Sequence, residues 1–219
     1  MAKVFFPSCK NKISYPCASE KLLEYLTASY GVETVAGCCR NDHKKLSPED
    51  TAVIVCNSCF AFCEESSSAG EIISVWEIID SDSKFPFPNY NEEKITVQDC
   101  WRATGRNKIH DAVRSLLKKM NIEPVELNEN RNKSIFCGMT TFMQLPVHSA
   151  ELAPRRYGTD AVGIFNEYPE EDRISFMKEH ARQFTTDRAV CYCTSCDIGI
   201  NKGGKKPISL INLLFNEAQ

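Results

Sequence analysis

The chain of 219 residues has no apolar stretch approaching the roughly 20 residues that a membrane-spanning helix requires. Its first residues, MAKVFFPSC, carry one lysine and an apolar run that is too short for a secretory signal. Positive charge is not in excess either, because the formal net charge is −3, whereas surfaces that bind nucleic acid or anionic membranes carry clustered Lys and Arg. These absences predict a cytoplasmic protein with no membrane span and no nucleic-acid partner.

Histidine is also scarce, with only four residues that show no metal-ligand spacing, whereas cysteine is abundant, with twelve. Cytoplasmic thiols stay reduced, so many cysteines in a cytoplasmic chain indicate metal binding or catalysis more often than disulfide bonds. The alternative is a secreted protein held together by disulfides, which the chain length and the missing signal disfavour. With 42% hydrophobic residues, the chain can form one large core or two small ones.

Three segments of the first half recur in the same order in the second half, which is hard to produce by chance. The pairs are KVFFPSC (3–9) with KITVQDC (94–100), AVIVCNSC (52–59) with AVCYCTSC (189–196), and ISVWEII (73–79) with ISLINLL (208–214). This recurrence predicts an internal duplication. We expect a first domain over residues 1–90 and a second over 91–219.

Apolar periodicity predicts alternating strands and helices in both halves. The runs that end in cysteine are typical of short buried strands that deliver a ligand at their carboxyl end. Helical spacing is found from Ser19 to Tyr30, from Ile109 to Met120 and from Pro169 onward, a further strand is expected at 124–127, and residues 81–91 form the expected linker. Strands joined by helices predict an α/β fold with parallel sheets, in which chemistry gathers at the carboxyl ends of the strands.

The cysteines that could bind metal form one set in each half. The first set is Cys9, Cys38, Cys39, Cys56 and Cys59, and the second set is Cys100, Cys137, Cys193 and Cys196. Each set contains a Cys-x-x-Cys motif, which brings two thiolates close enough for one metal. A thioredoxin-like redox pair is the alternative, but it leaves the other cysteines unexplained. Zinc needs four ligands, and the second set supplies four.

The adjacent pair Cys38-Cys39 distinguishes the first set. Neighbouring residues of an extended chain point to opposite sides, so two adjacent thiolates reach a single ion only through an unusual turn. An iron–sulfur cluster relaxes this constraint, because the two thiolates can hold different irons. The pair therefore favours iron over zinc, with a vicinal disulfide or two packing cysteines as the alternative.

Four further residues have less specific interpretations. Cys17, Cys63 and Cys191 have no counterpart in the other half and are expected to be small buried residues. His43, close in sequence to Cys38-Cys39, is either a proton donor to a leaving thiolate or a surface histidine.

The ordered motifs resemble a known family over nearly the whole chain. They are similar to the two cysteine-rich CCG domains of heterodisulfide reductase, in its disulfide-reducing component, and of related anaerobic iron–sulfur oxidoreductases. The resemblance is carried by FPSC, GCCR, VIVCNSC, VQDC, NKSIFCG and AVCYCTSC. It implies two Rossmann-like halves related by a pseudo-twofold axis, with noncubane [4Fe–4S] clusters that reduce a disulfide substrate by one electron per cluster.

Transferred by position, the family pattern assigns the whole first set to one noncubane [4Fe–4S] cluster, with Cys9, Cys38 and Cys39 at the reaction site. The second half departs from the pattern, since Phe136 stands where the family has the first cysteine of its pair and Gln98 replaces a histidine. In the first half Arg40 stands in place of glycine. The second set then fits a conventional [4Fe–4S] cube, a zinc ion or no metal.

We therefore expect an iron–sulfur oxidoreductase subunit that reduces a small disulfide, or relays electrons, at the first set. Because no flavin motif is recognisable, its electrons are expected from a ferredoxin-like or flavoprotein partner subunit. The alternative is a non-catalytic adaptor, stabilised by zinc or an iron–sulfur cluster, in a larger complex.

Overall fold

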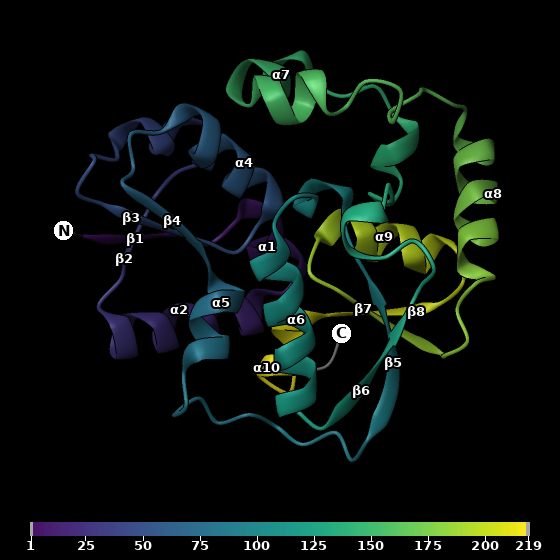
Figure 1. Ribbon diagram of the computed structural model, residues 1–219, viewed down its shortest axis with the longest axis horizontal. Helices are drawn as coiled ribbons and strands as arrows, with labels where there is room; N and C mark the ends of the chain where they lie inside the picture. The colour runs from purple at the N-terminus through teal and green to yellow at the C-terminus, as the bar shows by residue number, and fades with distance from the viewer. Residues whose placement is uncertain (1, 218–219) are drawn as a thin grey trace. The chain divides into compact units, whose positions relative to one another are not determined.

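The computed structural model describes residues 2–217 as an α/β protein with two four-stranded parallel sheets (Figure 1). The chain forms two compact units. The first contains the residues up to Asp82 together with Pro146–Ala161, and the second contains Ser83–Leu145 and the residues from Val162 onward. Pro146–Ala161, here named the strap, thus belongs to the second half of the sequence but to the first unit.

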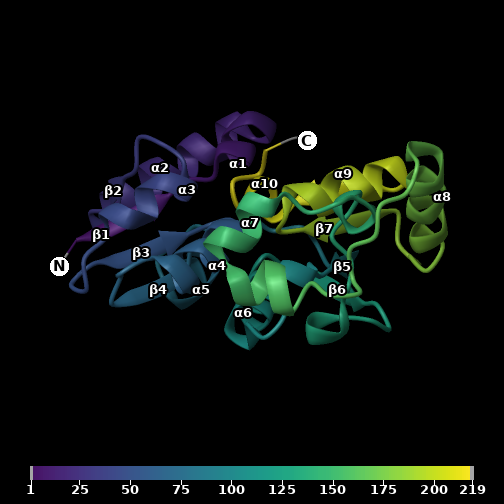
Figure 2. The same cartoon turned by 90° about the horizontal axis from the view of Figure 1, so that it is seen from above.

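The sheet of the first unit has the strand order β2-β1-β3-β4. Its strands are β1 (Lys3–Phe6), β2 (Glu33–Thr34), β3 (Thr51–Ile54) and β4 (Glu71–Ser74). Its helical segments are α1 (Cys9–Ser14), α2 (Pro16–Tyr30), α3 (Cys39–Asp42), η1 (His43–Lys45), α4 (Asn57–Ser66), α5 (Val75–Ser81), α7 (Val147–Leu152) and η5 (Pro154–Thr159). Figure 2 shows α2 and α4 on opposite faces of this sheet.

The helix that the sequence predicts from Ser19 begins earlier, at Pro16. Proline is favoured in the first turn of a helix because its missing N–H has no intrahelical acceptor there. The predicted end is confirmed, since Gly31 closes α2 in the left-handed conformation with φ 62°.

The sheet of the second unit has the order β6-β5-β7-β8. Its strands are β5 (Glu93–Gln98), β6 (Ile122–Glu126), β7 (Arg188–Cys191) and β8 (Lys206–Ser209). Its helical segments are η2 (Trp101–Ala103), α6 (Asn107–Lys119), η3 (Arg131–Lys133), η4 (Thr140–Phe142), α8 (Glu170–Ala181), α9 (Thr194–Lys202) and α10 (Leu210–Leu214). In Figure 2, α6 and α9 lie on opposite faces of the sheet.

The two sheets share their strand order when each is numbered from its own first strand. In both, the first strand lies between the second and the third. The last strand of each sheet passes directly into a helix through a serine N-cap, Ser74 before α5 and Ser209 before α10. At Ser74 the cap is a complete capping box with Glu77.

Apolar side chains from both faces of each sheet form the core. All four residues of β3 are buried, as parallel strands covered on both faces require. In the second unit, α6 buries a continuous stripe that includes Ile109, Val113 and Leu116. Among the described residues, no helix has both the length and the apolar character needed to cross a bilayer.

Candidate metal centres

Each unit places its cysteines just beyond the carboxyl ends of neighbouring parallel strands. Cys9 and Cys56 follow β1 and β3, and Cys100 and Cys193 follow β5 and β7. This arrangement confirms the position expected from the sequence. All twelve cysteines are free thiols, so the disulfide interpretation is wrong for this structure.

Four thiols of the first set form a row of contacts rather than one compact group. Cys39 contacts Cys38 and Cys59, and Cys59 also contacts Cys56. Cys9 is close enough for its charge to act on Cys38. The contact with Cys59 lowers the pKa of Cys39, while the contacts of Cys59 with Cys39 and Cys56, together with burial, raise the pKa of Cys59. In this row Cys39 therefore loses its proton more readily than an ordinary thiol, whereas Cys59 keeps its proton more firmly.

The start of a helix solves the geometric problem of the adjacent pair. Cys38 is the N-cap of α3, with extended angles φ −98° and ψ 141°, whereas Cys39 is already the first helical residue. The chain turns between them, and the two thiols contact each other. The Asp42 carboxylate holds this turn by accepting a hydrogen bond of 2.8 Å from the Gly37 amide.

A cavity of about 350 Å³ lies against the first set. Cys9, Cys38, Cys39 and Cys59 line it, together with Lys12. The set reaches from solvent to the core, since Cys9 is exposed, whereas Cys39 and Cys59 are only 9% and 4% exposed. An inorganic group in this cavity would have both protein ligands and an open side.

His43 is fully buried, so its interpretation as a surface histidine is wrong. Its Nδ1 lies 2.7 Å from the Cys39 carbonyl oxygen. A carbonyl only accepts, so Nδ1 carries the proton and donates to Cys39. His43 therefore holds the backbone of a predicted ligand.

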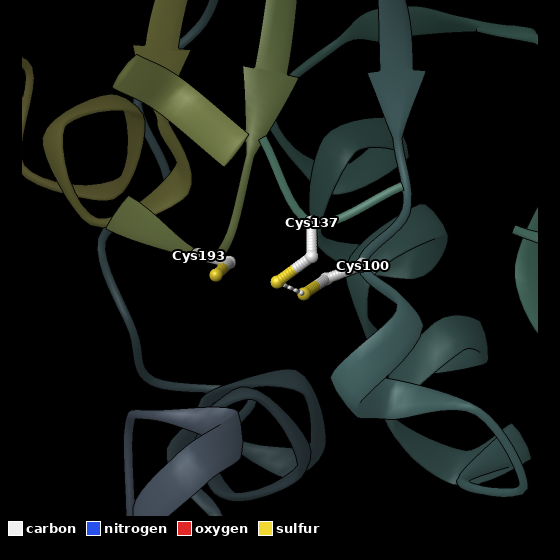
Figure 3. A group of neighbouring side chains, drawn as sticks. All are labelled: Cys100, Cys137 and Cys193. Atoms are coloured by element: carbon white, nitrogen blue, oxygen red, sulfur yellow. Dashed lines mark hydrogen bonds between the residues drawn. The ribbon is translucent and has the colours of Figure 1, made fainter. Parts of the chain in front are cut away.

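The second set is compact. The Sγ atoms of Cys100 and Cys137 lie 3.8 Å apart, and those of Cys100, Cys137 and Cys193 all lie within 4.8 Å of one another (Figure 3). The Cys196 thiol contacts all three. Within residues 2–217, this is where three cysteine, histidine or acidic ligand atoms come together in a group that could hold one metal ion.

Three of the four thiols of this second set are closed to solvent. Cys100, Cys137 and Cys196 are fully buried, and Cys193 is partly buried. Burial raises the pKa of the Cys100 and Cys196 thiols well above the usual value. Contacts with the thiols of Cys100, Cys137 and Cys196 lower the pKa of Cys193 well below it, so Cys193 is the member of the group that most readily becomes a thiolate.

A buried cation faces that thiolate. The Arg102 Nη1 lies 4.0 Å from the Cys193 Sγ, and its charge acts to lower the Cys193 pKa further. Arg102 lies in η2, the turn that follows Cys100, and is 8% exposed. A cation buried beside thiolates offsets the negative charge that a metal–thiolate site accumulates.

The residue before Cys100 anchors the second set to the fold. The Asp99 carboxylate accepts hydrogen bonds from Arg114 at 2.7 and 2.5 Å, from the Tyr192 hydroxyl at 2.8 Å and from the Arg131 amide at 2.6 Å. Burial by itself would raise the Asp99 pKa, but these bonds hold it below its usual value. The end of β5, and with it Cys100, is thereby fixed.

Two glycines allow the loop that carries Cys137 to approach the CTSC motif. Gly138 has φ +59° and lies against the backbone of Ser195, between Cys193 and Cys196. Gly199, in α9, lies against the Cα atom of Gly138. A side chain at either position would keep the Cys137 loop away from the motif.

The two departures of the second half from the family pattern pack together. The Phe136 ring stacks on the His180 ring, with centroids 4.0 Å apart. The His180 Nε2 lies 2.6 Å from the Gln98 Oε1 and its Nδ1 lies 2.9 Å from the Gln183 Nε2. This is the hydrogen bonding of a neutral imidazole that donates from Nε2 and accepts at Nδ1. Phe136, at the position where the resemblance leads us to expect a cysteine, thus forms part of an aromatic stack.

Of the three cysteines that were expected to be buried, two are. Cys63 and Cys191 lie in the cores of their units, and burial raises the pKa of Cys63 to about 12. Cys17 is exposed, so that prediction is wrong. Its position in the first turn of α2 points it away from the apolar face formed by Leu22 and Leu26.

Sequence reasoning missed several residues that shape these sites. A glycine immediately after Cys137 and an arginine in the turn after Cys100 are local signals that could have identified Gly138 and Arg102. Asp99 and the strap carry no such signal, because their partners are distant in sequence.

Comparisons of this chain with protein-family models, with curated proteins and with solved structures find no match.

Proposed function

We propose that this chain is an iron–sulfur oxidoreductase subunit of the heterodisulfide reductase type, with its reaction site at the first cysteine set. One observation carries the proposal: four of the five cysteines line a cavity of about 350 Å³, and Cys9 at its side is exposed. A purely structural metal site is closed, whereas a reactive one keeps an open position. The first set has the open form.

The residues present fit a multi-iron group better than a single ion. In the part of the chain that the structure describes, no three thiols of the first set lie mutually within 4.8 Å, although neighbouring thiols touch in a row. Four sulfur ligands around a cavity, with Cys56 in contact with one of them, suit a noncubane [4Fe–4S] cluster, which would be held by Cys9, Cys38, Cys39, Cys56 and Cys59. Such a group supplies one-electron chemistry at sulfur.

The chain itself would supply positive charge beside that group. Lys12 lines the cavity and provides a positive charge near Cys9. Reduction of a small disulfide to two thiols consumes two electrons and two protons, and the electrons come from a ferredoxin-like or flavoprotein partner subunit. Water at the open side of the cavity supplies the protons.

For the second set we propose a single metal ion, most consistent with structural zinc. With zinc–sulfur bonds of about 2.3 Å, two corners of a tetrahedral site lie about 3.8 Å apart, which is the separation of the Cys100 and Cys137 sulfurs. A four-iron cube spreads its ligands more widely, because each sulfur binds a different iron. Burial of the set agrees with a structural role.

We also infer that the two units arose by duplication of one CCG-type domain. The support is their common strand order, the cysteines after their first and third strands, and the serines at the N-cap positions of α5 and α10. The first copy would have kept an open cluster site, and the second would have become structural.

The rival function is a non-catalytic adaptor, which the closed second set favours. Anaerobic purification followed by assay of iron, sulfide and zinc separates the two. The oxidoreductase is expected to be brown, to contain about four irons per chain at the first set and to bleach on reduction. A colourless protein that contains zinc alone would refute the redox proposal and support the adaptor.

A further inference from the structure

The strap contacts the helix that begins in the CNSC motif. Its residue Tyr157 is 6% exposed and its hydroxyl lies 2.8 Å from the Ser58 Oγ. Ser58 stands between the predicted ligands Cys56 and Cys59. The Tyr157 ring packs on Phe62, one helical turn along α4, with centroids 5.7 Å apart.

The far end of α4 holds the strap by a second set of contacts. The Glu65 carboxylate accepts hydrogen bonds from the backbone amides of Arg155 at 2.7 Å and Arg156 at 3.0 Å. The Arg155 guanidinium pairs with Glu64 at 2.8 Å. The Ser66 hydroxyl donates to the Leu152 carbonyl at 2.5 Å.

The position of these carboxylates needs an explanation. Glu64 and Glu65 stand in the last turn of α4, where the negative end of the helix dipole disfavours acidic residues. Glu65 is nevertheless 9% exposed in its side chain and bonded to the strap. Holding the strap against α4 accounts for this placement.

From these contacts we infer that the strap is a positioning element of the first cysteine set and that Tyr157 is its positioning residue. The Tyr157 hydroxyl holds the Ser58 side chain in place. Ser58 in turn fixes the turn that directs the Cys56 and Cys59 thiols toward the metal site that they would share. Outer-shell partners of this kind orient metal ligands and tune the metal. The inference rests on the first set being a metal centre but not on which metal it holds.

The first experiment needs no metal. In the reduced, metal-free protein, mass spectrometry follows the alkylation of each cysteine by iodoacetamide, and Cys193 in the same molecule serves as the internal reference. Loss of one hydrogen bond worth about 1 kcal/mol corresponds to a change of about fivefold. We expect Y157F and S58A each to raise the Cys56 to Cys193 rate ratio by about that factor.

Coupling between the two residues is the decisive part. The double variant Y157F/S58A should be no faster than either single variant, because the same hydrogen bond is lost in all three. S58T keeps a hydroxyl and should restore the wild-type ratio. Y168F is the control, since Tyr168 is a 39% exposed residue of the second unit whose ring contacts survive the change.

The second experiment uses the protein with metal bound. Release of first-set metal to a chelator should be about tenfold faster in Y157F and S58A, with release from the second set unchanged. An unaltered alkylation ratio, or additive effects in the double variant, would overturn the positioning role even if the melting temperature fell. Absence of iron would refute the proposed redox function but leave the alkylation result intact, so the two failures are distinguishable.

Discussion

Gly138 and Ser195 pack so closely that a Cβ atom at position 138 would lie 1.7 Å from the Ser195 carbonyl oxygen. The G138A variant therefore has to move the Cys137 loop away from the CTSC motif, and it also strains a residue with φ +59°. We expect it to lose the second-set metal and at least about 2 kcal/mol of stability. Metal analysis and urea unfolding measure both, and G158A, where a Cβ meets open space, is the control.

Cys38 and Cys17 provide a matched pair in the first unit. Cys38→Ala should abolish the first-set cofactor, because it removes a predicted sulfur ligand that contacts Cys39. Cys17→Ala changes an exposed residue and should leave the unfolding free energy within about 0.5 kcal/mol. Visible absorbance and iron content decide the outcome. Equal iron content in the two variants would show that Cys38 is not a ligand.

Arg102 should control how tightly the second set holds its metal. Its guanidinium lies 4.0 Å from the Cys193 sulfur, so R102Q removes a cation that favours the thiolate. We expect metal affinity to fall about tenfold, as measured by competition with a chromogenic chelator. Lys108→Gln is the control, because it removes an exposed cation of the same unit. An unchanged affinity in R102Q would contradict this electrostatic role.

The buried pair of Arg114 and Asp99 should be costly to break. R114L leaves a fully buried carboxylate unpaired and should lower the free energy of unfolding by about 3–5 kcal/mol. Arg182 and Glu179 form an exposed pair, so R182L should cost less than about 1 kcal/mol. Chemical denaturation compares the two variants. Similar losses in both would mean that Arg114 does not hold Asp99.

His180 should make stability depend on pH. Burial lowers its pKa from 6.5 to about 4. Between these two pH values, His180 is protonated in the unfolded chain but neutral in the folded protein. The free energy of unfolding is therefore highest above the unfolded pKa of 6.5, and it decreases as the pH falls toward 4. Between about pH 7.5 and pH 5.5 this loss should be about 1 kcal/mol. In H180Q, at matched metal content, that part of the pH dependence should vanish; its persistence would assign the effect to other groups.

Local patterns carried most of the fold and part of the sites. Strand ends, the cysteines behind them, the end of α2 at Gly31 and the helix after Pro169 follow from short-range periodicity and turn chemistry, which one segment contains by itself. The exposure of Cys17 could not be predicted in this way, because it depends on which face of α2 meets the sheet. The burial of His43 likewise depends on how η1 packs against α4.

The contacts of Asp99 and Tyr157 are of a different kind. Asp99 bonds to Arg114 and Tyr192, and Tyr157 bonds to Ser58, so each site depends on residues brought together only by the complete fold. A single sequence shows such residues but not their pairing. The cysteines were recognisable because their chemistry is unusual, whereas an aspartate or a tyrosine is not.

The placement of the strap has a consequence for the integrity of the molecule. The polypeptide passes from one unit to the other three times, after Asp82, after Leu145 and after Ala161. A protease that nicks the linker after Asp82 would therefore release neither piece, because the larger fragment still carries the segment clasped to α4. If the two halves were expressed as separate chains, the first unit would be complete only after the strap of the second chain had bound to the first chain.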